Sequence, residues 1–511
     1  MCEIYDMSNS RNQPNVLVIM YDQMAASALH AYGNTTSITP HIDKIASEGV
    51  VFDAAYSNSP LCTPARYCMM TGQLPSTTGG YDNAAYLPST VPTVAHHMRK
   101  AGYRTILSGK MHFVGPDQLH GFEERRTTDI YPADFGWTPD WTKFEERIDW
   151  WYHNMASVTG AGTAQVTNQL LYDDEVGQNA IRALHDVARS DDNRPFFIVA
   201  SFTHPHDPYV TRKKYWDMYE DVEIDMPRVS VDPNPHPHTK RLMHVSDMEH
   251  STITQDDVRN ARRAYYGNVS YVDEWTGKLV DTLQQLQVAD NTIIMLVADH
   301  GDMLGEHGLW YKMNFFEDST RIPLIFHSPK NFPAHRVSEP VSLVDVLPTL
   351  TDIAGAPAEQ QKLAGDSLVP FLESADHSTP RTVLGEYTAE GAISPIVMIR
   401  RGTMKFIHSP GDPDQLFDLA QDRDELNNLC DDSSLHDVVS AFRAEVDARW
   451  NLAELHNQVL ESQRNRRFIS QSLRKGAYTS WEFTPPRDSS TEYMRNHLDL
   501  NDVERLARWP R

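Results

Sequence analysis

The stretch "NVLVIMY", residues 15–21, is an unbroken apolar run rich in β-branched side chains, followed at once by the polar pair Asp22 and Gln23. A strand that is apolar on both faces is typical of a parallel sheet covered by helices on each side. Short runs of the same kind recur along the chain, at residues 49–56, 103–108, 196–202, 292–298 and 323–327. The sequence therefore predicts a large sheet built from these runs.

Helical patterns lie between the apolar runs, notably at residues 93–102, which end in Gly102, and at residues 257–287. Alternation of strands and helices predicts a doubly wound α/β fold, with a large mixed, mostly parallel sheet flanked by helices. Residues 125–160, crowded with Trp, Tyr and Asp, and the Pro-rich residues 225–250 lack such patterns, and we expect long loops there.

The pattern changes after about residue 380, where short antiparallel strands and then an amphipathic helix near residues 434–473 are expected. We predict an α/β domain over residues 1–380, a smaller C-terminal α+β domain over 381–475 and a tail over 476–511. The tail is polar but contains four large aromatic residues, Trp481, Phe483, Tyr493 and Trp509. We expect it to dock, either on its own chain or on a neighbouring subunit.

Composition excludes several classes of protein. A net charge of -24 argues against nucleic-acid binding, which depends on clustered Lys and Arg. Four cysteines without CxxC spacing in a 511-residue chain do not make a disulfide scaffold, and they favour a reducing compartment. The N-terminus does not resemble a signal peptide, and no apolar run approaches the ~20 residues of a membrane helix. We expect a soluble, cytoplasmic protein.

Polar side chains follow the ends of successive predicted strands. Ligands bind at the carboxyl ends of the strands in open α/β sheets, so these residues are expected to meet. A single polar residue after a strand is usually only a turn, but five successive groups are hard to explain as turns. The groups are Asp22 and Gln23; Cys62 and Arg66; Lys110 and His112; His204, His206 and Asp207; and Asp299, His300 and Asp302, with Lys312 soon after.

The chemistry of these groups divides by charge. Oxygen ligands and one imidazole, from Asp22, Gln23, Asp299 and His300, suit a divalent cation such as Ca²⁺ or Mg²⁺. The segment "ADHGD", residues 298–302, could alternatively be an acidic helix cap and not part of a metal site. Lysine and arginine side chains would form a cationic well for an anionic tetrahedral group, from Arg66, Lys110 and Lys312. His112 and His206 are expected to titrate near neutrality and to move protons.

The segment "CTPARYCMMTGQLP", residues 62–75, reads as a helix with Pro64 in its first turn, where the missing N–H is tolerated. Cys62 would then lie at the positive end of the helix dipole, where a nucleophile is activated. Arg66 would point to the same site from one turn later. The alternative is a buried structural thiol.

"CTPAR", residues 62–66, matches the C-x-P-x-R signature of type I sulfatases, in which the Cys is oxidised to formylglycine. Longer segments resemble choline sulfatases, and the likeness covers essentially the whole chain. These segments include residues 108–140, "SFTHPHDPY" at 201–209, "DHGDMLGEHGLWYKMNFFE" at 299–317 and "RNHLDL" at 495–500. The resemblance implies an alkaline-phosphatase-like sulfuric ester hydrolase that is matured by a formylglycine-generating enzyme.

The resemblance also implies roles for individual residues. Cys62 would become formylglycine and, with Asp22, Gln23, Asp299 and His300, would bind one divalent metal ion, Ca²⁺ or alternatively Mg²⁺ or Mn²⁺. Sulfate would be bound by Arg66, Lys110 and Lys312, with Asn83 beside it. His112 would assist turnover of the intermediate, and His206 would protonate or orient the leaving oxygen. The pair Asp22-Gln23 departs from the two Asp of many sulfatases, which lowers the ligand charge.

A hydrated formylglycine has a chemical advantage over serine. One of its hydroxyls attacks sulfur and the alcohol departs, which leaves a sulfated enzyme. Deprotonation of the second hydroxyl then expels sulfate and restores the aldehyde, whereas a sulfated serine would need direct attack by water on sulfur.

A choline leaving group needs aromatic faces and a carboxylate for its quaternary ammonium. Residues 125–160 supply Trp137, Trp141, Trp150, Trp151 and Tyr152, with Asp129, Asp149 and Asn154 among them. From the resemblance we select Trp137, Asn154 and Glu390. Aromatic residues in a loop more often pack against the rest of the protein than bind a cation, and this alternative stays open. The tail near Asn501 and Asp502 would close the site from a neighbouring subunit in a homodimer or homotetramer.

Two other functions remain open at this point. The same nucleophile, metal and cationic well would serve a phosphonate or phosphate mono- or diester hydrolase. The second possible function is non-catalytic binding of quaternary ammonium compounds, with Cys62 left unmodified. A panel of sulfate, phosphate and phosphonate esters separates the first from a choline sulfatase, and the mass of residue 62 tests the second.

Overall fold

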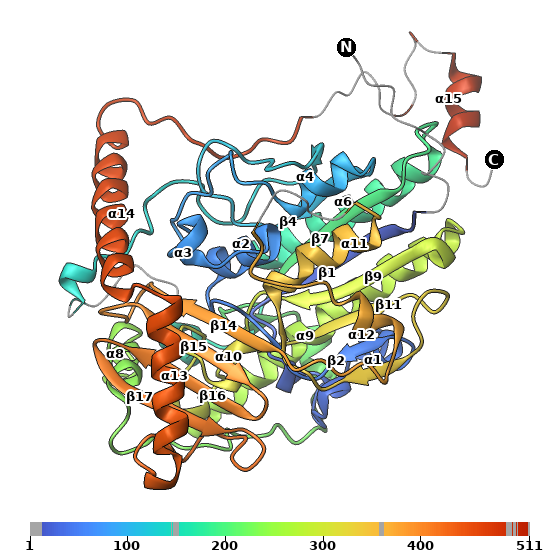
Figure 1. The fold of residues 1–511 in the computed structure, drawn as a ribbon. Coiled ribbons are helices and arrows are strands. Elements are labelled where there is room, and N and C mark those ends of the chain that lie inside the picture. Colours follow the sequence, from blue (N-terminus) through green and yellow to red (C-terminus); the bar gives the residue numbers. More distant parts are fainter. Residues whose placement is uncertain are drawn as a thin grey trace.

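A computed structural model describes residues 13–144, 146, 153–356, 362–486, 493, 497 and 499–508. Its centre is an eight-stranded sheet in the order β12-β2-β11-β9-β1-β7-β4-β5 (Figure 1). Four central strands are parallel to one another: β1 Asn15–Asp22, β4 Arg104–Gly109, β7 Phe196–Pro205 and β9 Thr292–Ala298. The others are β2 Val50–Phe52, β5 Glu124–Arg125, β11 Leu324–His327 and β12 His335–Val337. β11 is antiparallel to both of its neighbours, so the sheet is mixed and mostly parallel, as predicted.

The run at residues 49–56, predicted as one strand, forms two strands in two sheets. β2 joins the large sheet, whereas β3, Ala55–Tyr56, pairs with β10, Arg321–Ile322, and β13, Val341–Ser342. A further two-stranded sheet joins β6, Gly162–Thr163, to β8, Val210–Thr211.

The register of the central strands brings their carboxyl ends to one edge of the sheet. Leu17 pairs with Ile198 of β7 and with Ile294 of β9, and Leu107 of β4 pairs with Val199. The strands therefore end side by side, and the next residues along the chain emerge together. The sequence predicted this meeting because apolar runs of similar length precede each polar group.

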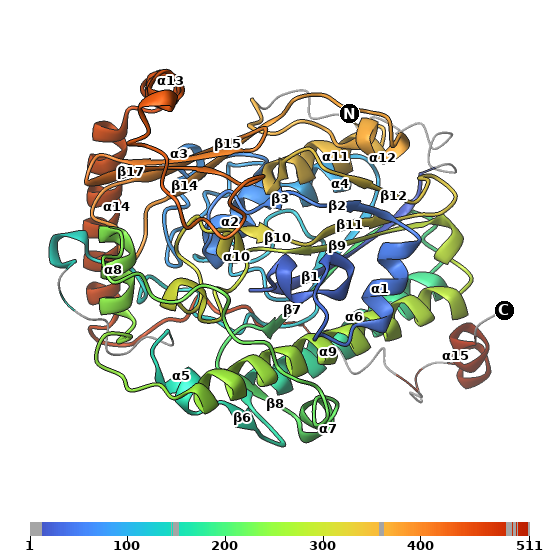
Figure 2. The ribbon, with the colours of Figure 1, turned by 90° about the horizontal axis from the view of Figure 1, so that it is seen from below.

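Helices cover both faces of the large sheet (Figure 2). One face carries α1 Pro40–Ser47, α6 Asn168–Arg189 and α9 Gln255–Gln285. The other face carries α2 Cys62–Thr71, α4 Val94–Lys100 and α11 Val346–Ile353. The predicted doubly wound arrangement is confirmed. Short helices complete the connections: α3 Pro75–Thr78, α5 Ala156–Thr159, α7 Lys213–Asp217, α8 Pro237–Val245, α10 Glu317–Thr320 and α12 Val369–Glu373.

The C-terminal part contains a four-stranded antiparallel sheet of β14 Thr382–Tyr387, β15 Ile396–Arg401, β16 Met404–Ser409 and β17 Asp412–Asp418. The single helix predicted near 434–473 is two helices, α13 His436–Arg449 and α14 Leu452–Leu473. They separate at Trp450, whose backbone is extended and whose indole N–H donates to Oε1 of Glu386 at 2.7 Å. The domain boundaries at 380 and 475 stay a prediction.

The two expected loops contain more structure than their sequences indicate. Helix α8 lies within residues 225–250, and it begins at Pro237, a residue that the first turn of a helix tolerates. Within 125–160, Asp140 caps a short 3₁₀ helix and α5 follows. Asp149, Trp150, Trp151 and Tyr152 lie outside the described residues.

The beginning of the tail docks on its own chain. Tyr478 donates to Oδ2 of Asp134 at 2.8 Å, and Oε1 of Glu482 accepts the N–H of Ala133 at 2.9 Å. The rings of Trp481 and Phe135 lie 5.2 Å apart. Helix α15, Leu500–Ala507, follows, and Trp509 lies outside the described residues. Nowhere in the described chain is a helix both long and apolar enough to cross a membrane.

Candidate active site

Cys62 is the first residue of helix α2 and is 1% exposed. Leu61 before it is extended, and Gly72, at φ 65°, ends the helix in a left-handed conformation that suits glycine. The N–H of Thr63 donates to Oδ1 of Asn83 at 3.0 Å. The Nδ2 of Asn83 makes no hydrogen bond to any described residue. The start of α2 therefore presents residue 62 beside an amide donor that is open to a ligand.

Residue 62 lies among side chains from two strand ends. Its Sγ is 3.3 Å from Nε2 of His300 and 3.7 Å from Oδ1 of Asp22. Ligand atoms from Asp22, Cys62, Asp299 and His300 all lie within 4.8 Å of one another, and all four residues are buried. Nδ1 of His300 donates to the carbonyl oxygen of Gly301 at 3.0 Å, which leaves the lone pair of Nε2 free. Two carboxylates and this imidazole fit a single divalent cation.

Gln23 is bound differently from these ligands. Its backbone is left-handed, with φ 63°, and its N–H donates to Oδ1 of Asp299 at 3.0 Å. Its side-chain Nε2 donates to Asp302 and Asp207, and its Oε1 accepts from Nζ of Lys312 at 2.5 Å. Oε1 is the only side-chain atom with which Gln23 can bind a cation, and it is shared with Lys312.

The cationic side chains converge on the same carboxylates. Arg66 donates to Oδ2 of Asp22 at 3.0 Å and to Oδ2 of Asp299 at 2.9 Å, and Lys110 also pairs with Asp22. Burial opposes ionisation of Asp22, but Lys110, His206 and Arg66 together hold its pKa well below the usual range. The same carboxylate raises the pKa of Lys110 against the effect of burial. Lys110 and Arg66 therefore both stay charged next to residue 62.

The two histidines of "HPHDP", His204 and His206, have different partners in the structure. Nζ of Lys312 lies 2.8 Å from Nε2 of His206, and Nδ1 of His206 lies 2.6 Å from the carbonyl oxygen of Asp207. His204 instead pairs with Asp173 on α6, at 2.7 Å. Burial, and then the charge of Lys312, lower the pKa of His206 well below its ordinary value. The expectation that His206 titrates near neutrality is wrong, because a cation faces it in a buried site.

His112 is held by its backbone and not by its ring. It has φ 58°, and its N–H donates to Oδ2 of Asp129 at 2.8 Å. Neither ring nitrogen has a hydrogen-bond partner among the described residues, and the ring packs edge-on to Trp137 at 5.8 Å. Burial and then Lys110 lower the pKa of His112 to about 3. The expectation of titration near neutrality is wrong here too, and the ring is a neutral proton acceptor.

The thiol of Cys62 is not activated. Burial, and then the charge of Asp22, raise its pKa to about 11. Burial and the charge of Asp22 together outweigh the predicted effect of the helix dipole and the charges of Lys110 and Lys312, which act to lower this pKa. An unmodified thiol at this place is a weak nucleophile.

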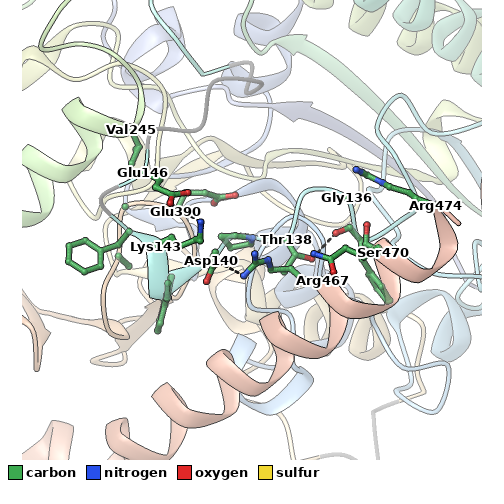
Figure 3. A pocket seen from close by; sticks show the side chains of 17 residues that line it. Gly136, Thr138, Asp140, Lys143, Glu146, Val245, Glu390, Arg467, Ser470 and Arg474 are labelled. Carbon is green, nitrogen blue, oxygen red and sulfur yellow. Dashed lines mark hydrogen bonds and ion pairs between the residues drawn. The ribbon is translucent and has the colours of Figure 1, made fainter.

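A pocket of about 320 Å³ opens between the loop at residues 135–146 and helix α14 (Figure 3). Glu390 forms part of its wall, is 5% exposed and has no partner for Oε2 among the described residues. Burial, and then the charge of Asp82, raise the pKa of Glu390 to about 8. Trp141 also lines the pocket, and its indole N–H donates to the carbonyl oxygen of Ala389 at 2.9 Å.

Trp137 and Asn154, chosen together with Glu390, do not line this pocket. The ring of Trp137 packs on Tyr131 at 5.1 Å and on His112, while its neighbours Gly136 and Thr138 form part of the pocket wall. Oδ1 of Asn154 accepts the N–H of Ala156 at 2.9 Å at the start of α5. Trp141 shares the pocket with Glu390, as do Phe135 and Phe144.

Several residues near the site were not singled out from the sequence. The Tyr131 ring lies 4.3 Å from Nζ of Lys110, and its hydroxyl is 3.4 Å from Nδ1 of His206. His153 Nδ1 lies 3.2 Å from Oδ1 of Asp207. Both residues come from the loop 125–160, where no strand end marks them. Asp129, expected among the polar residues near the ammonium, instead pairs with Arg125 at 2.8 Å.

Comparison with known proteins agrees with this geometry. The sulfatase family model matches residues 14–356, so the chain belongs to the sulfatase family, whose members hydrolyse sulfate esters. A model described as N-sulphoglucosamine sulphohydrolase, C-terminal, matches residues 305–451. A third, described as choline sulfatase enzyme C terminal, matches residues 457–509.

The chain is 48% identical to the choline-sulfatase of Rhizobium meliloti (strain 1021), over 98% of this chain and 99% of that protein. It is 27% identical to an arylsulfatase of Clostridium perfringens, over 84% and 93% of the two chains. Among solved structures, the phosphonate monoester hydrolase of Agrobacterium radiobacter superposes with a TM-score of 0.68 at 23% identity, over 88% and 96% of the chains. That likeness concerns the fold alone.

Proposed function

We propose that this protein hydrolyses choline sulfate to choline and inorganic sulfate. The observation that carries the proposal is the position of residue 62, at the start of α2 and within 3.7 Å of both Asp22 and His300, with Arg66 and Lys110 paired to Asp22. The 48% identity to a choline-sulfatase over nearly the whole chain supports the choice of alcohol.

Arg66, Lys110 and Lys312 bind the oxygens of the sulfate in this proposal. They are buried, so their fixed charge stabilises the charge that develops on those oxygens during the reaction. Nδ2 of Asn83 adds a neutral donor beside residue 62. The cations are anchored by Asp22, Asp299 and Gln23, and they need no reorganisation when the ester arrives.

Residue 62 would act as formylglycine, whose hydrated form supplies one hydroxyl that attacks sulfur and a second that expels the sulfate. Asp22, Asp299 and His300, with Gln23 through its Oε1, would hold one divalent cation, Ca²⁺ in our proposal, which polarises the sulfate and lowers the pKa of the attacking hydroxyl. The raised pKa of the unmodified Cys62 thiol agrees with a need for this oxidation.

Two neutral imidazoles divide the proton transfers. His112 has two ring nitrogens without partners among the described residues, and it takes the proton from the second hydroxyl of residue 62 when the sulfated intermediate turns over. Lys312 and His206 lie 2.8 Å apart, and this pair supplies the proton that the leaving alcohol requires. Asp207 accepts from His206 and fixes the orientation of its ring.

The quaternary ammonium of choline would lie against Glu390. A buried carboxylate oxygen without a partner costs free energy unless a ligand compensates it, and an ammonium that cannot donate hydrogen bonds is a fitting ligand. Trp141 supplies an aromatic face in the same pocket, and Trp137 borders the sulfate end. Asn154, at the start of α5, is a further substrate-binding residue in this proposal.

A phosphonate or phosphate ester hydrolase is the second candidate, because the solved structures with this fold include a phosphonate monoester hydrolase. The cationic well accepts either kind of anion, so the geometry at sulfur or phosphorus does not separate the two. Glu390 in its pocket favours a cationic alcohol, and the 48% identity to a choline-sulfatase favours the sulfate ester of that alcohol over its phosphate ester.

The test is a substrate panel on protein whose residue 62 has been measured by mass spectrometry. We expect kcat/KM to be highest for choline sulfate and lower for phosphocholine and for aryl phosphonates, and we expect Cys62→Ala to abolish turnover. Highest kcat/KM on a phosphonate would overturn the proposed substrate. A plain thiol at residue 62 in active protein from its native host would overturn the proposed nucleophile.

The oligomeric state, the cytoplasmic location and maturation by a formylglycine-generating enzyme are also proposals. A homodimer or homotetramer is supported by α15, a helix at the end of the tail whose Leu500 is exposed. Among the described residues Cys68 and Cys430 form no disulfide, which supports a reducing compartment.

A further inference from the structure

Arg466, on helix α14, is a buried cation that lies outside the cationic well. It is 6% exposed, and its partner Asp82 is fully buried. Nη1 donates to Oδ1 of Asp82 at 2.5 Å and Nη2 donates to Oδ2 at 2.7 Å, so the guanidinium holds the carboxylate with two parallel hydrogen bonds. The two residues are 384 positions apart in the chain.

Asp82 leads directly to the reaction centre. Its Oδ1 also accepts the N–H of Ala84 at 3.0 Å, so the carboxylate fixes the turn that contains Asn83. Asn83 in turn accepts the N–H of Thr63 at 3.0 Å, next to residue 62. The chain of contacts from the C-terminal helix to the start of α2 therefore consists of three hydrogen-bonded steps.

The same guanidinium reaches the loop at residues 135–146. Nη1 of Arg466 donates to Oγ1 of Thr138 at 3.3 Å, and Gln463 on the same helix accepts the N–H of Trp141 at 3.0 Å. One face of α14 thus touches the Asn83 turn and the loop that forms the pocket wall. The hydrogen bond to Thr138 is longer than the pair with Asp82, so the effect on Asn83 is expected to be the larger one.

We propose that Arg466 is a positioning residue of the active site, which acts through Asp82 to hold Asn83 beside the sulfate oxygens. This inference rests on the proposed function, because it assumes that an oxyanion is bound at residue 62. Lysine cannot replace this arginine, since one ammonium cannot make two parallel hydrogen bonds to both oxygens of Asp82. Any loss of activity in Arg466→Lys would therefore come from the changed hydrogen-bond geometry at Asp82, because the charge stays the same.

The test is a double-mutant cycle between Arg466→Lys and Asn83→Ala. We measure kcat/KM on choline sulfate and 4-nitrophenyl sulfate, and the Kd of inorganic sulfate by calorimetry. Arg466→Lys should lower kcat/KM on both substrates by roughly tenfold or more and weaken sulfate binding similarly. The double variant should lose no more than Asn83→Ala alone. The control Arg464→Lys, exposed on the same helix, should behave like the unmodified sequence.

A purely structural role predicts a different result. In that case the losses of the two substitutions add, or Arg466→Lys lowers the Tm and leaves kcat/KM and Kd unchanged in folded protein; either result would overturn the inference. Should Arg466→Lys fail to fold, Asp82→Asn replaces it in the cycle with the same expectation. If the unmodified sequence binds inorganic sulfate but does not hydrolyse choline sulfate, the proposed substrate is wrong. The double-mutant cycle measured on the Kd of inorganic sulfate then still tests the role of Arg466.

Discussion

The side-chain Nε2 of Gln23 lies 2.6 Å from Oδ2 of Asp302 and 3.2 Å from Oδ1 of Asp207, and all three residues are fully buried. An amide at position 23 can donate to both carboxylates, whereas a second aspartate, which many sulfatases have there, would face two like charges. The departure at Gln23 is thus explained by its neighbours: it removes one negative charge where two others are already buried.

Gln23→Glu tests this explanation. It exchanges two hydrogen bonds for repulsion from Asp302 and Asp207 at nearly constant size, and the remaining oxygen still faces Lys312, which offsets part of the cost. We expect a net loss of about 2–4 kcal/mol of stability, with a Tm several degrees lower. Thermal unfolding of the two proteins measures the difference. Gln23→Glu combined with Asp302→Asn should recover most of the loss, because a donor again faces the new carboxylate. An unchanged Tm for the single variant would show that the two aspartates do not require the amide.

The pH dependence of KM should report Glu390. Its pKa is about 8, raised by burial and then by Asp82, and lowered by Lys312 and Arg466. The carboxylate forms only as pH rises through that value, while the charge of a quaternary ammonium is fixed. We therefore expect KM for choline sulfate to fall by up to ~10-fold between pH 7 and pH 9. Steady-state kinetics at constant ionic strength measures this change.

Two controls isolate the carboxylate. Glu390→Gln should abolish the pH dependence of KM and keep KM at its high, low-pH value. 4-Nitrophenyl sulfate has no cation, and its KM should change little in this variant or across this pH range. A pH dependence that is the same for both substrates would assign the titration to another group and contradict the role of Glu390.

Asp129 is predicted to act on turnover through His112. Its Oδ2 accepts the N–H of Met111 at 3.0 Å and of His112 at 2.8 Å, and it also pairs with buried Arg125. Asp129→Asn weakens the support of a residue at φ 58°, so we expect kcat to fall by roughly 10- to 100-fold with a small change in KM. Asp117→Asn is a matched control, because Asp117 accepts the backbone N–H groups of Leu119 and His120 away from the site. Equal kcat in both variants would contradict this role.

The sequence predicts the four central strands and the meeting of their polar ends well, because the apolar runs of β1, β4, β7 and β9 are buried and parallel. Asp22, Lys110, His206 and Asp299 could be placed together for that reason. The pKa values of His112, His206 and Cys62 could not be predicted, since they depend on which buried charges lie within a few ångströms. Arg466 could not be found either, because nothing in an amphipathic helix marks the one arginine that reaches a turn 384 residues away.

The structure of the two long loops, residues 125–160 and 225–250, could be predicted less well from the sequence. Residues 225–250 contain a helix that starts at a proline, and the aromatic pattern of 125–160 did not separate Trp141, which lines the pocket, from Trp137. Aromatic residues in a loop carry no period that shows their direction. Their neighbours in space decide it: these are Gln463 of α14 and Ala389 for Trp141, and His112 and Tyr131 for Trp137.

Truncation after residue 475 tests the contribution of the tail to the pocket. It removes Tyr478, Trp481 and Glu482, which contact Asp134, Phe135 and Ala133 respectively. Because Phe135 lines the pocket and precedes Trp137 by two residues, we expect KM for choline sulfate to rise several-fold and kcat to change less. Truncation after residue 498 keeps these three contacts and removes α15, so a rise in its KM would measure closure of the site by Asn501 and Asp502 of a neighbouring copy. Size-exclusion chromatography of both variants shows whether α15 joins copies of the chain. Unchanged KM after truncation at 475 would mean that these contacts do not hold the loop, and that its own hydrogen bonds to α14 suffice.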